Sequence, residues 1–198
     1  MQITIEKHFP VASTPEACWH ILSDINALTS CMPGAELTGT IDERNFKGQV
    51  RVKVGPAIAA FAGTIELQEV DVNAKRIAIL GRGADRGGSS ASMHLTATIS
   101  KTEAGASELH GIAEVTVNGK FAQLGGRMMN SVADMILAQF AENFAAMASS
   151  AEVSPASSSD SVKPSTAPQT TAPKELNGLS ILWTLIKQMV GRLFGKHA

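Results

Sequence analysis

Apolar and polar positions alternate through most of the first 117 residues, and this alternation predicts strands. In residues 2–9, Ile3 and Ile5 fall on one side of the chain and polar residues fall on the other, which is the period of a half-buried strand. The same alternation recurs in four later segments, residues 46–54, 61–68, 93–99 and 109–117, and residues 75–81 predict a shorter strand. Short turns separate them, including the glycine-rich stretch 82–89, so we expect five or six antiparallel strands in direct succession.

Two short helices are predicted between the first strand and the later ones. Ser13 or Thr14 is a suitable N-cap, and Pro15 fits the first turn of a helix that ends near residue 23. Residues 24–34 predict a second short helical or turn segment, which a Pro-Gly pair closes.

The period changes to 3.6 in residues 121–148, which predict a long amphipathic helix. Its apolar face carries Phe121, Met128, Val132, Met135, Ile136 and Phe140, and its polar face carries Arg127, Asn130, Asp134, Ala138 and Glu142. Such a helix must press its apolar face against the concave side of the sheet. We therefore expect residues 1–148 to form an α+β domain, a curved antiparallel sheet wrapped around a long C-terminal helix, with an internal hydrophobic cavity.

The composition changes sharply after residue 148. Residues 149–173 consist mainly of serine, alanine, proline and threonine, and such a segment buries too little apolar surface to offset its ordering entropy. It predicts a disordered linker. The chain becomes hydrophobic again in residues 174–198, so this linker leads to a further element rather than to a bare tail.

Residues 174–198 predict an amphipathic, basic helix that lies on a membrane surface. Its apolar face carries Leu179, Leu182, Trp183, Ile186, Met189, Val190, Leu193 and Phe194. A transmembrane helix is the competing interpretation, but Lys187 and Arg192 would then lie in the hydrocarbon core, at a cost of several kcal/mol each. Docking on the protein's own surface or on a partner is a third possibility. The long tether favours the membrane.

Composition narrows the remaining possibilities. The formal net charge is −1, lysine and arginine are scattered, and tyrosine is absent, which argues against nucleic-acid binding. No charged segment followed by an apolar stretch opens the chain, so we expect a cytoplasmic protein. Cys18 and Cys31 lack metal-site spacing and are expected to be free thiols, although the sequence leaves a disulfide open.

Several segments carry a resemblance to a known family: CMPGAE (31–36), VKVGPAIAAFAGTIEL (52–67), GRGADRGGSSASMHLTATI (81–99) and GKFAQLGGRMMNSVADMILAQFAENFA (119–145). Over residues 1–148 the chain resembles the family of the carbon monoxide dehydrogenase G subunit, within the START/polyketide cyclase-like (SRPBCC) superfamily. The resemblance implies a helix-grip fold with a hydrophobic pocket. It also implies association with molybdenum-containing carbon monoxide dehydrogenase or related molybdenum hydroxylases, a C-terminal membrane anchor and a quinone-handling role.

No catalytic motif is present: the chain lacks G-x-S-x-G, H-E-x-x-H and C-x-x-C. The stretch 81–88, GRGADRGG, leads into a strand and therefore lacks the helix N-terminus of a phosphate loop. His94 and His110 fall on polar faces of neighbouring strands and can meet, together with Glu114, although a solvent-facing pair is favoured over a metal site. We expect no enzymatic activity, no metal and no covalent cofactor.

The ligand-binding candidates are Met32, Phe61, Leu95, Leu124, Met128, Val132, Met135, Ile136, Gln139, Phe140 and Asn143. A methionine and phenylalanine stripe suits an adaptable lipid pocket, although such stripes also form plain core. Gln139 and Asn143 can hydrogen-bond a quinone carbonyl or, equally, a backbone group. Residues 31–34 are expected at the cavity mouth, where they can act as a gate.

These observations lead to a first hypothesis, a non-enzymatic carrier of a quinone, menaquinone or ubiquinone. The carrier would serve electron transport from a molybdenum dehydrogenase as a peripheral protein on the cytoplasmic face of the inner membrane. In a second hypothesis, the protein is an adaptor that recruits the dehydrogenase to the membrane and carries no ligand. An enzyme of the cyclase type is the third, and it lacks a convincing acid–base pair.

Overall fold

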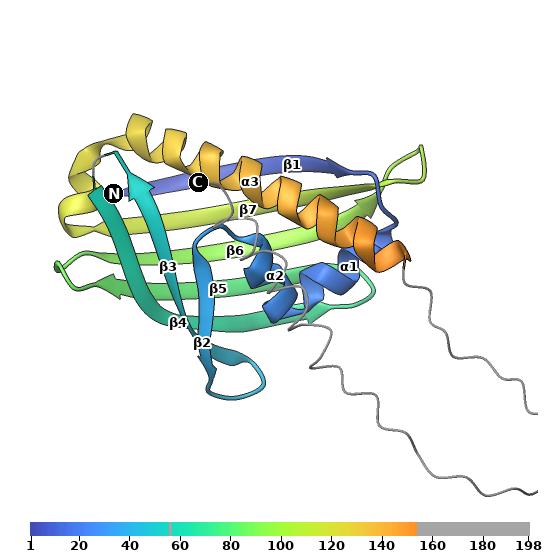
Figure 1. Ribbon diagram of the computed structural model, residues 1–198, viewed down its shortest axis with the longest axis horizontal. Coiled ribbons are helices and arrows are strands. Elements are labelled where there is room, and N and C mark those ends of the chain that lie inside the picture. The colour runs from blue at the N-terminus through green and yellow to red at the C-terminus, as the bar shows by residue number, and fades with distance from the viewer. Residues whose placement is uncertain (56, 154–198) are drawn as a thin grey trace, which may run out of the picture. The chain divides into compact units, whose positions relative to one another are not determined.

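The computed structural model describes residues 1–55 and 57–153 (Figure 1). It contains seven strands, two short helices, a 3₁₀ helix and a long C-terminal helix. In chain order these are β1 (Gln2–Val11), α1 (Pro15–Ser23), α2 (Ile25–Cys31), β2 (Ala35–Thr40), β3 (Asn45–Val54), β4 (Ala57–Asp71), β5 (Arg76–Asp85), β6 (Ser90–Lys101), β7 (Ser107–Asn118), η1 (Gly119–Leu124) and α3 (Gly126–Val153). The predicted α+β arrangement is confirmed.

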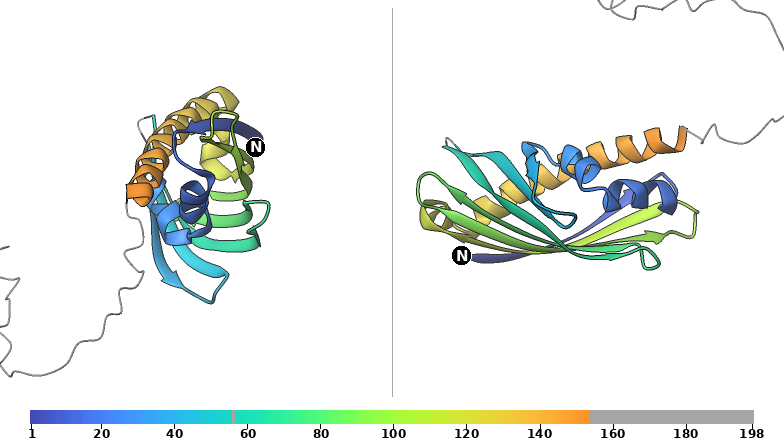
Figure 2. Two further views of the ribbon diagram at one scale, coloured as in Figure 1. Left: turned by 90° about the vertical axis from the view of Figure 1, so that its right-hand side faces the viewer. Right: turned by 90° about the horizontal axis from the view of Figure 1, so that it is seen from below.

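The seven strands form one antiparallel sheet in the order β1-β7-β6-β5-β4-β3-β2. Strands β2 to β7 follow one another as hairpins, and β1 closes the far edge by pairing with β7. Seen end-on, the sheet curls and the helices fill its open side, with α3 running diagonally across it (Figure 2). Each strand therefore turns one set of alternating side chains toward α3 and the other set outward.

Glycines allow part of this curvature. Gly48, Gly63 and Gly83 lie opposite one another on β3, β4 and β5. A Cβ atom at Gly63 would overlap the carbonyl oxygen of Arg82, so β5 approaches β4 at a distance that only glycine permits.

Side-chain caps start both short helices. The Thr14 hydroxyl accepts a hydrogen bond from the Ala17 N–H at 3.3 Å, which identifies Thr14 rather than Ser13 as the cap of α1. The Asp24 carboxylate accepts from the Asn26 and Ala27 N–H groups at 2.8 and 3.2 Å and separates α1 from α2. The helical prediction for residues 24–34 is therefore correct as far as Cys31.

The long helix differs from its prediction at both ends. Residues 119–124 form a 3₁₀ turn, and Gly125, at φ +79°, breaks the chain direction before α3 begins. At the other end α3 continues to Val153, five residues into the predicted linker. Contacts to the N-terminal region hold this last turn: Ser149 meets the Ser13 hydroxyl at 3.3 Å, and Glu152 accepts a hydrogen bond from the Thr14 N–H.

Two strand predictions also need correction. Strand β5 runs to Asp85, so residues 82–85 of the predicted turn pair with β4 and β6 instead. Strand β2 was not among the segments identified by alternation, because its residues beyond Leu37 are exposed on both faces at the sheet edge. With β2, six strands follow β1 in the described residues, which agrees with the predicted five or six.

Residues 154–198 lie outside the described part of the chain, and with them the rest of the predicted linker and the whole predicted membrane helix. Among the described helices, none is long and apolar enough to cross a membrane.

Candidate functional site

A cavity of about 460 Å³ lies between the concave face of the sheet and α3. All seven strands contribute to its wall, together with α1, α2, η1 and α3. Its volume falls within the roughly 300–1,000 Å³ typical of small-molecule sites. The side chains around it include Ile3, Ile5, Phe9, Val50, Val52, Val54, Phe61, Ile65, Ile79, Leu95, Ala113, Val115 and Phe121. The wall is therefore almost entirely hydrocarbon.

Three of the few polar side chains of the wall have partners of their own. Gln49 donates a hydrogen bond to Glu36 at 2.7 Å, and Lys7 forms an ion pair with Asp134 of α3 at 3.0 Å. Arg82 lies between the inward Gly81 and Gly83 of β5 and is exposed, so its side chain points to the outer face of the sheet. The charged lining residues are Lys7, Glu36 and Arg82, and in the described part of the chain none of them forms an ion pair with another. The cavity thus has an apolar interior, and the half-exposed Lys7 side chain gives it a polar margin beside α3.

The cavity brings together six of the eleven predicted ligand-binding residues: Met32, Phe61, Leu95, Val132, Ile136 and Phe140. They come from the turn after α2, from β4 and β6, and from α3. Whether any of them contacts a ligand stays a prediction.

The other five predicted residues lie elsewhere. Leu124, Met128 and Met135 are exposed, Met128 at 40% and Met135 at 57% of the full residue surface, and none of the three lines the cavity. Gln139 is exposed as well. Asn143 donates a hydrogen bond to the Cys31 carbonyl oxygen at 2.9 Å, so its amide joins α3 to the end of α2. Asn143 was expected to bond either a quinone carbonyl or a backbone group. The structure shows a backbone partner, and this partner belongs to a helix rather than to the sheet.

The inward arc of α3 is rotated from the predicted one. The residues that face the cavity are Met129, Val132, Ala133, Ile136, Leu137 and Phe140. Because Met128 and Met129 are adjacent and both apolar, the pattern alone favoured the wrong one. The predicted polar face is confirmed, since Arg127, Asn130, Asp134, Ala138 and Glu142 are all exposed.

The turn after α2 borders the cavity through Met32. Gly34 follows at φ +76°, and its carbonyl accepts a hydrogen bond from the Arg51 N–H at 2.9 Å, which ties the turn to β3. Cys18 and Cys31 are both free and fully buried, and burial raises the pKa of each thiol. The predicted free thiols are confirmed, and the gating role of residues 31–34 stays a prediction.

His94 and His110 do not meet. In the β6–β7 register His94 lies opposite Glu114, whereas His110 lies opposite Thr98, four residues away along the strand. His94 instead bonds Gln68 at 2.8 Å, and His110 bonds Glu6 of β1 at 2.8 Å. The pairing of His110 with Glu6 was not predicted, because it joins residues 104 positions apart in the chain.

The GRGADRGG stretch forms a strand end and a turn, as its lack of a following helix predicted. Asp85 closes this turn by accepting a hydrogen bond from the Gly87 N–H at 3.1 Å and by pairing with Lys120 at 2.9 Å. The hydrogen bond from Lys120 lowers the pKa of Asp85 below its ordinary value. Lys120 also lies 5.0 Å from the centre of the Phe121 ring, which lines the cavity.

Known proteins resemble this chain in family and in fold. Residues 8–149 match the family of the carbon monoxide dehydrogenase G subunit (CoxG). A conserved protein from Geobacillus kaustophilus superposes with a TM-score of 0.68 at 18% identity, over 75% of this chain and 96% of that one. No curated protein matches the chain.

Two further solved structures share the fold at lower identity. The Zhui aromatase/cyclase from Streptomyces sp. R1128 superposes with a TM-score of 0.55 at 14% identity, over 79% of this chain and 99% of that one. A START superfamily protein from Mycobacterium smegmatis superposes with a TM-score of 0.54 at 14% identity, over 74% of this chain and 97% of that one. The curved sheet with its long C-terminal helix is thus the START-like helix-grip fold.

Proposed function

Because this chain belongs to the CoxG family of carbon monoxide dehydrogenase subunits, we propose that it is a membrane-tethered binding protein for a hydrophobic isoprenoid. The ligand is a quinone, menaquinone or ubiquinone, which the protein carries as electron acceptor for a molybdenum carbon monoxide dehydrogenase-type enzyme. The protein takes no part in the redox chemistry itself. It encloses the quinone tail, brings the molecule from the bilayer and presents the head group to the dehydrogenase.

The observation that carries this proposal is the apolar cavity under α3. Each methylene that leaves water for such an interior contributes about 0.8 kcal/mol, so a few isoprene units supply the binding energy. An isoprenoid tail needs no specific polar contact, and the wall offers almost none. A polar or charged ligand would leave its own groups unpaired in the same space.

The polar margin suits the other end of a quinone. Quinone carbonyl oxygens are acceptors only, so they require donors. Lining side chains that carry donors and do not belong to an outward strand position are those of Lys7 on β1 and Thr29 on α2. These two replace Gln139 and Asn143 as head-group candidates. A head group held at the rim remains accessible to an electron donor.

Membrane attachment is assigned to residues 174–198, which lie outside the described part of the chain. Their apolar face and basic flank match an interfacial helix. A tether of this kind raises the effective concentration of the carrier at the bilayer without any new contact to the ligand. The location proposed is the cytoplasmic face of the inner membrane.

Organic extraction and mass spectrometry of the purified full chain test the proposal. We expect an isoprenoid quinone in a molar ratio approaching one. Val132→Trp fills the cavity and should lower the recovered quinone at least tenfold. Met128→Trp is the matched control, because the same substitution on the same helix points away from the cavity, and it should retain the quinone.

Two results contradict the carrier. One is a chain that yields no quinone or other isoprenoid. The other is a quinone content that Val132→Trp leaves unchanged. If such a chain still co-sediments the dehydrogenase with vesicles, and loses this on deletion of residues 174–198, then the adaptor hypothesis replaces the carrier.

A further inference from the structure

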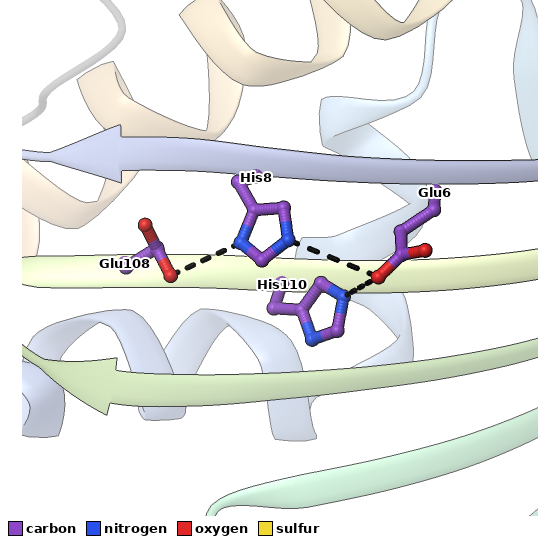
Figure 3. Close-up of polar contacts among 4 residues, drawn as sticks. All are labelled: Glu6, His8, Glu108 and His110. Atoms are coloured by element: carbon purple, nitrogen blue, oxygen red, sulfur yellow. Dashed lines mark hydrogen bonds and ion pairs between the residues drawn. The ribbon is translucent and has the colours of Figure 1, made fainter.

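Two histidines and two glutamates form a compact cluster on the outer face of the sheet, away from the cavity (Figure 3). His8 of β1 and His110 of β7 are paired directly across the strands, and their rings stack with centres 4.1 Å apart. Glu6 and Glu108 sit diagonally on either side of this pair. Because Ile5, Lys7 and Phe9 of β1 line the cavity, the alternate residues Glu6 and His8 point outward.

We propose that this cluster binds a divalent transition-metal ion, for which Zn²⁺ is the best chemical match, with His8, His110 and Glu6 as ligands. Imidazole nitrogen together with one carboxylate oxygen is a donor set that suits Zn²⁺, whereas Mg²⁺ and Ca²⁺ prefer oxygen alone. Three protein ligands leave a coordination position open to water at the protein surface.

The spacing of the donor atoms agrees with this proposal. Nε2 of His110 lies 2.8 Å from Oε1 of Glu6, and Nε2 of His8 lies 3.9 Å from the same oxygen. One ligand atom from each of the three residues falls within 4.8 Å of the others. Ligand atoms about 2.0–2.1 Å from a tetrahedral Zn²⁺ are roughly 3.3 Å apart. The two separations from Glu6 are within about 1 Å of this spacing, and rotation of the two rings adjusts the separation between the histidines.

Glu108 supplies the interaction that a metal-binding histidine usually has on its other nitrogen. Its Oε1 lies 3.1 Å from Nδ1 of His8. A hydrogen bond from Nδ1–H to this carboxylate leaves the lone pair on Nε2, the nitrogen that faces Glu6 and His110. Glu108 is thus a positioning residue for His8 rather than a ligand.

The local charge favours a cation. With neutral imidazoles, Glu6 and Glu108 give the cluster a charge of −2, and among the described residues neither carboxylate forms an ion pair with a lysine or an arginine. The residues opposite on β6, Thr98 and Ser100, are uncharged. A divalent ion balances this charge.

Binding requires the two rings to turn out of their near-parallel stack, in which the planes differ by 12°. The lone pairs of stacked rings run parallel, whereas those of two ligands must converge on the ion. Both side chains have room to rotate, since His8 is 53% exposed and His110 is 32% exposed.

Calorimetric titration of the untagged full chain with Zn²⁺ tests the site. We expect one saturable ion per chain. His8→Ala and His110→Ala should each abolish it, and Glu108→Gln should weaken it by about 10–100-fold, as loss of an orienting partner does at other metal sites. His94→Ala is the matched control, because His94 is an outward histidine on β6 that bonds Gln68 instead, and it should bind Zn²⁺ normally.

Spectroscopy provides a second measurement, which would not change if the histidines had only a structural role. Co²⁺ in place of Zn²⁺ should give visible d–d bands with the wild-type chain and not with His110→Ala. Circular dichroism of each variant checks that the fold is retained. Absence of a saturable ion, or saturable binding that persists in both histidine variants, would overturn the proposal.

Discussion

The two ends of the space between α3 and the sheet differ in how they are filled. At one end, which we call the packed end, Phe144 and Ala148 of α3 pack with α1, α2 and strand residues into a continuous core, and Phe140 lies between this core and the cavity. At the other, the hollow end, Met129, Val132, Ala133 and Ile136 of the same helix face the cavity. A small cluster around Val54, Val117 and Phe121 lies at the hollow end.

The difference shows how one helix serves two purposes. Helices α1 and α2 fill the space beneath the second half of α3, and among the described residues no comparable element lies beneath its first half. The packed end therefore supplies the stability that allows the hollow end to remain open. Substitutions of the same kind at the two ends should have different effects.

Truncation of a large side chain should give the largest difference in stability between the two ends. Phe144 is fully buried, so Phe144→Ala should lower the free energy of unfolding by roughly 3–5 kcal/mol. Ile136 already borders an empty volume, so Ile136→Ala should cost only about 1 kcal/mol. Urea or guanidinium denaturation measures both. Equal losses at the two positions would contradict the comparison.

Addition of a large side chain should give the next largest contrast. Ala148 is fully buried at the packed end, and Ala148→Phe should destabilise the fold by about 3 kcal/mol through overpacking. Ala133→Phe enters the cavity and should change stability by less than about 1 kcal/mol. The same denaturation curves report the result, and a severe loss in Ala133→Phe would mean that the hollow end is already full.

Two glycines that line the cavity test how the sheet bends around the hollow end. Gly63→Ala should lower stability by about 2 kcal/mol, because its new methyl group meets the Arg82 carbonyl. Gly111→Ala is the control, since nothing lies within 4 Å of a Cβ at that position. A near-neutral Gly63→Ala would show that the bend does not depend on the close approach of β4 and β5. Thermal melts compare the two variants.

The smallest effect concerns the turn beside the hollow end. The pKa of Asp85 is lowered by Lys120 in the folded state, so this pair stabilises the protein above the ordinary carboxyl pKa of about 3.9. That stabilisation is lost as the pH falls through the lower, folded pKa. Lys120→Met should therefore be less stable than the wild type at pH 7, and the difference should shrink toward pH 2. A difference that is constant with pH would exclude this ion pair as its source.

The sequence predicted the fold from local signals. Alternation identified β1 and four of the six later strands, and the 3.6 period identified α3, because both patterns reflect burial on one face. The strand β5 was predicted from residues 75–81, which do not alternate. The family resemblance then supplied the helix-grip topology, which no local pattern specifies. Strand β2 was missed because an exposed edge strand shows little alternation.

The site was predicted only in part, for two physical reasons. Alanine is small enough to face a cavity without adding to an apolar stripe, so Ala133 carried no signal and the predicted arc shifted to Met128 and Met135. The second reason is that some side chains have partners far away in the sequence. The bond from Asn143 to Cys31 and the pairing of His8 with His110 depend on the fold, not on neighbours in sequence.

Native mass spectrometry of the delipidated full chain, titrated with a short-tail ubiquinone, tests most directly whether the hollow end admits an apolar ligand. We expect one bound quinone per wild-type chain and at least a tenfold weaker adduct with Ala133→Phe. Ala138→Phe, on the exposed face of the same helix, should bind as the wild type does. Absence of the adduct, or an adduct of equal strength in all three chains, would contradict quinone binding at the hollow end.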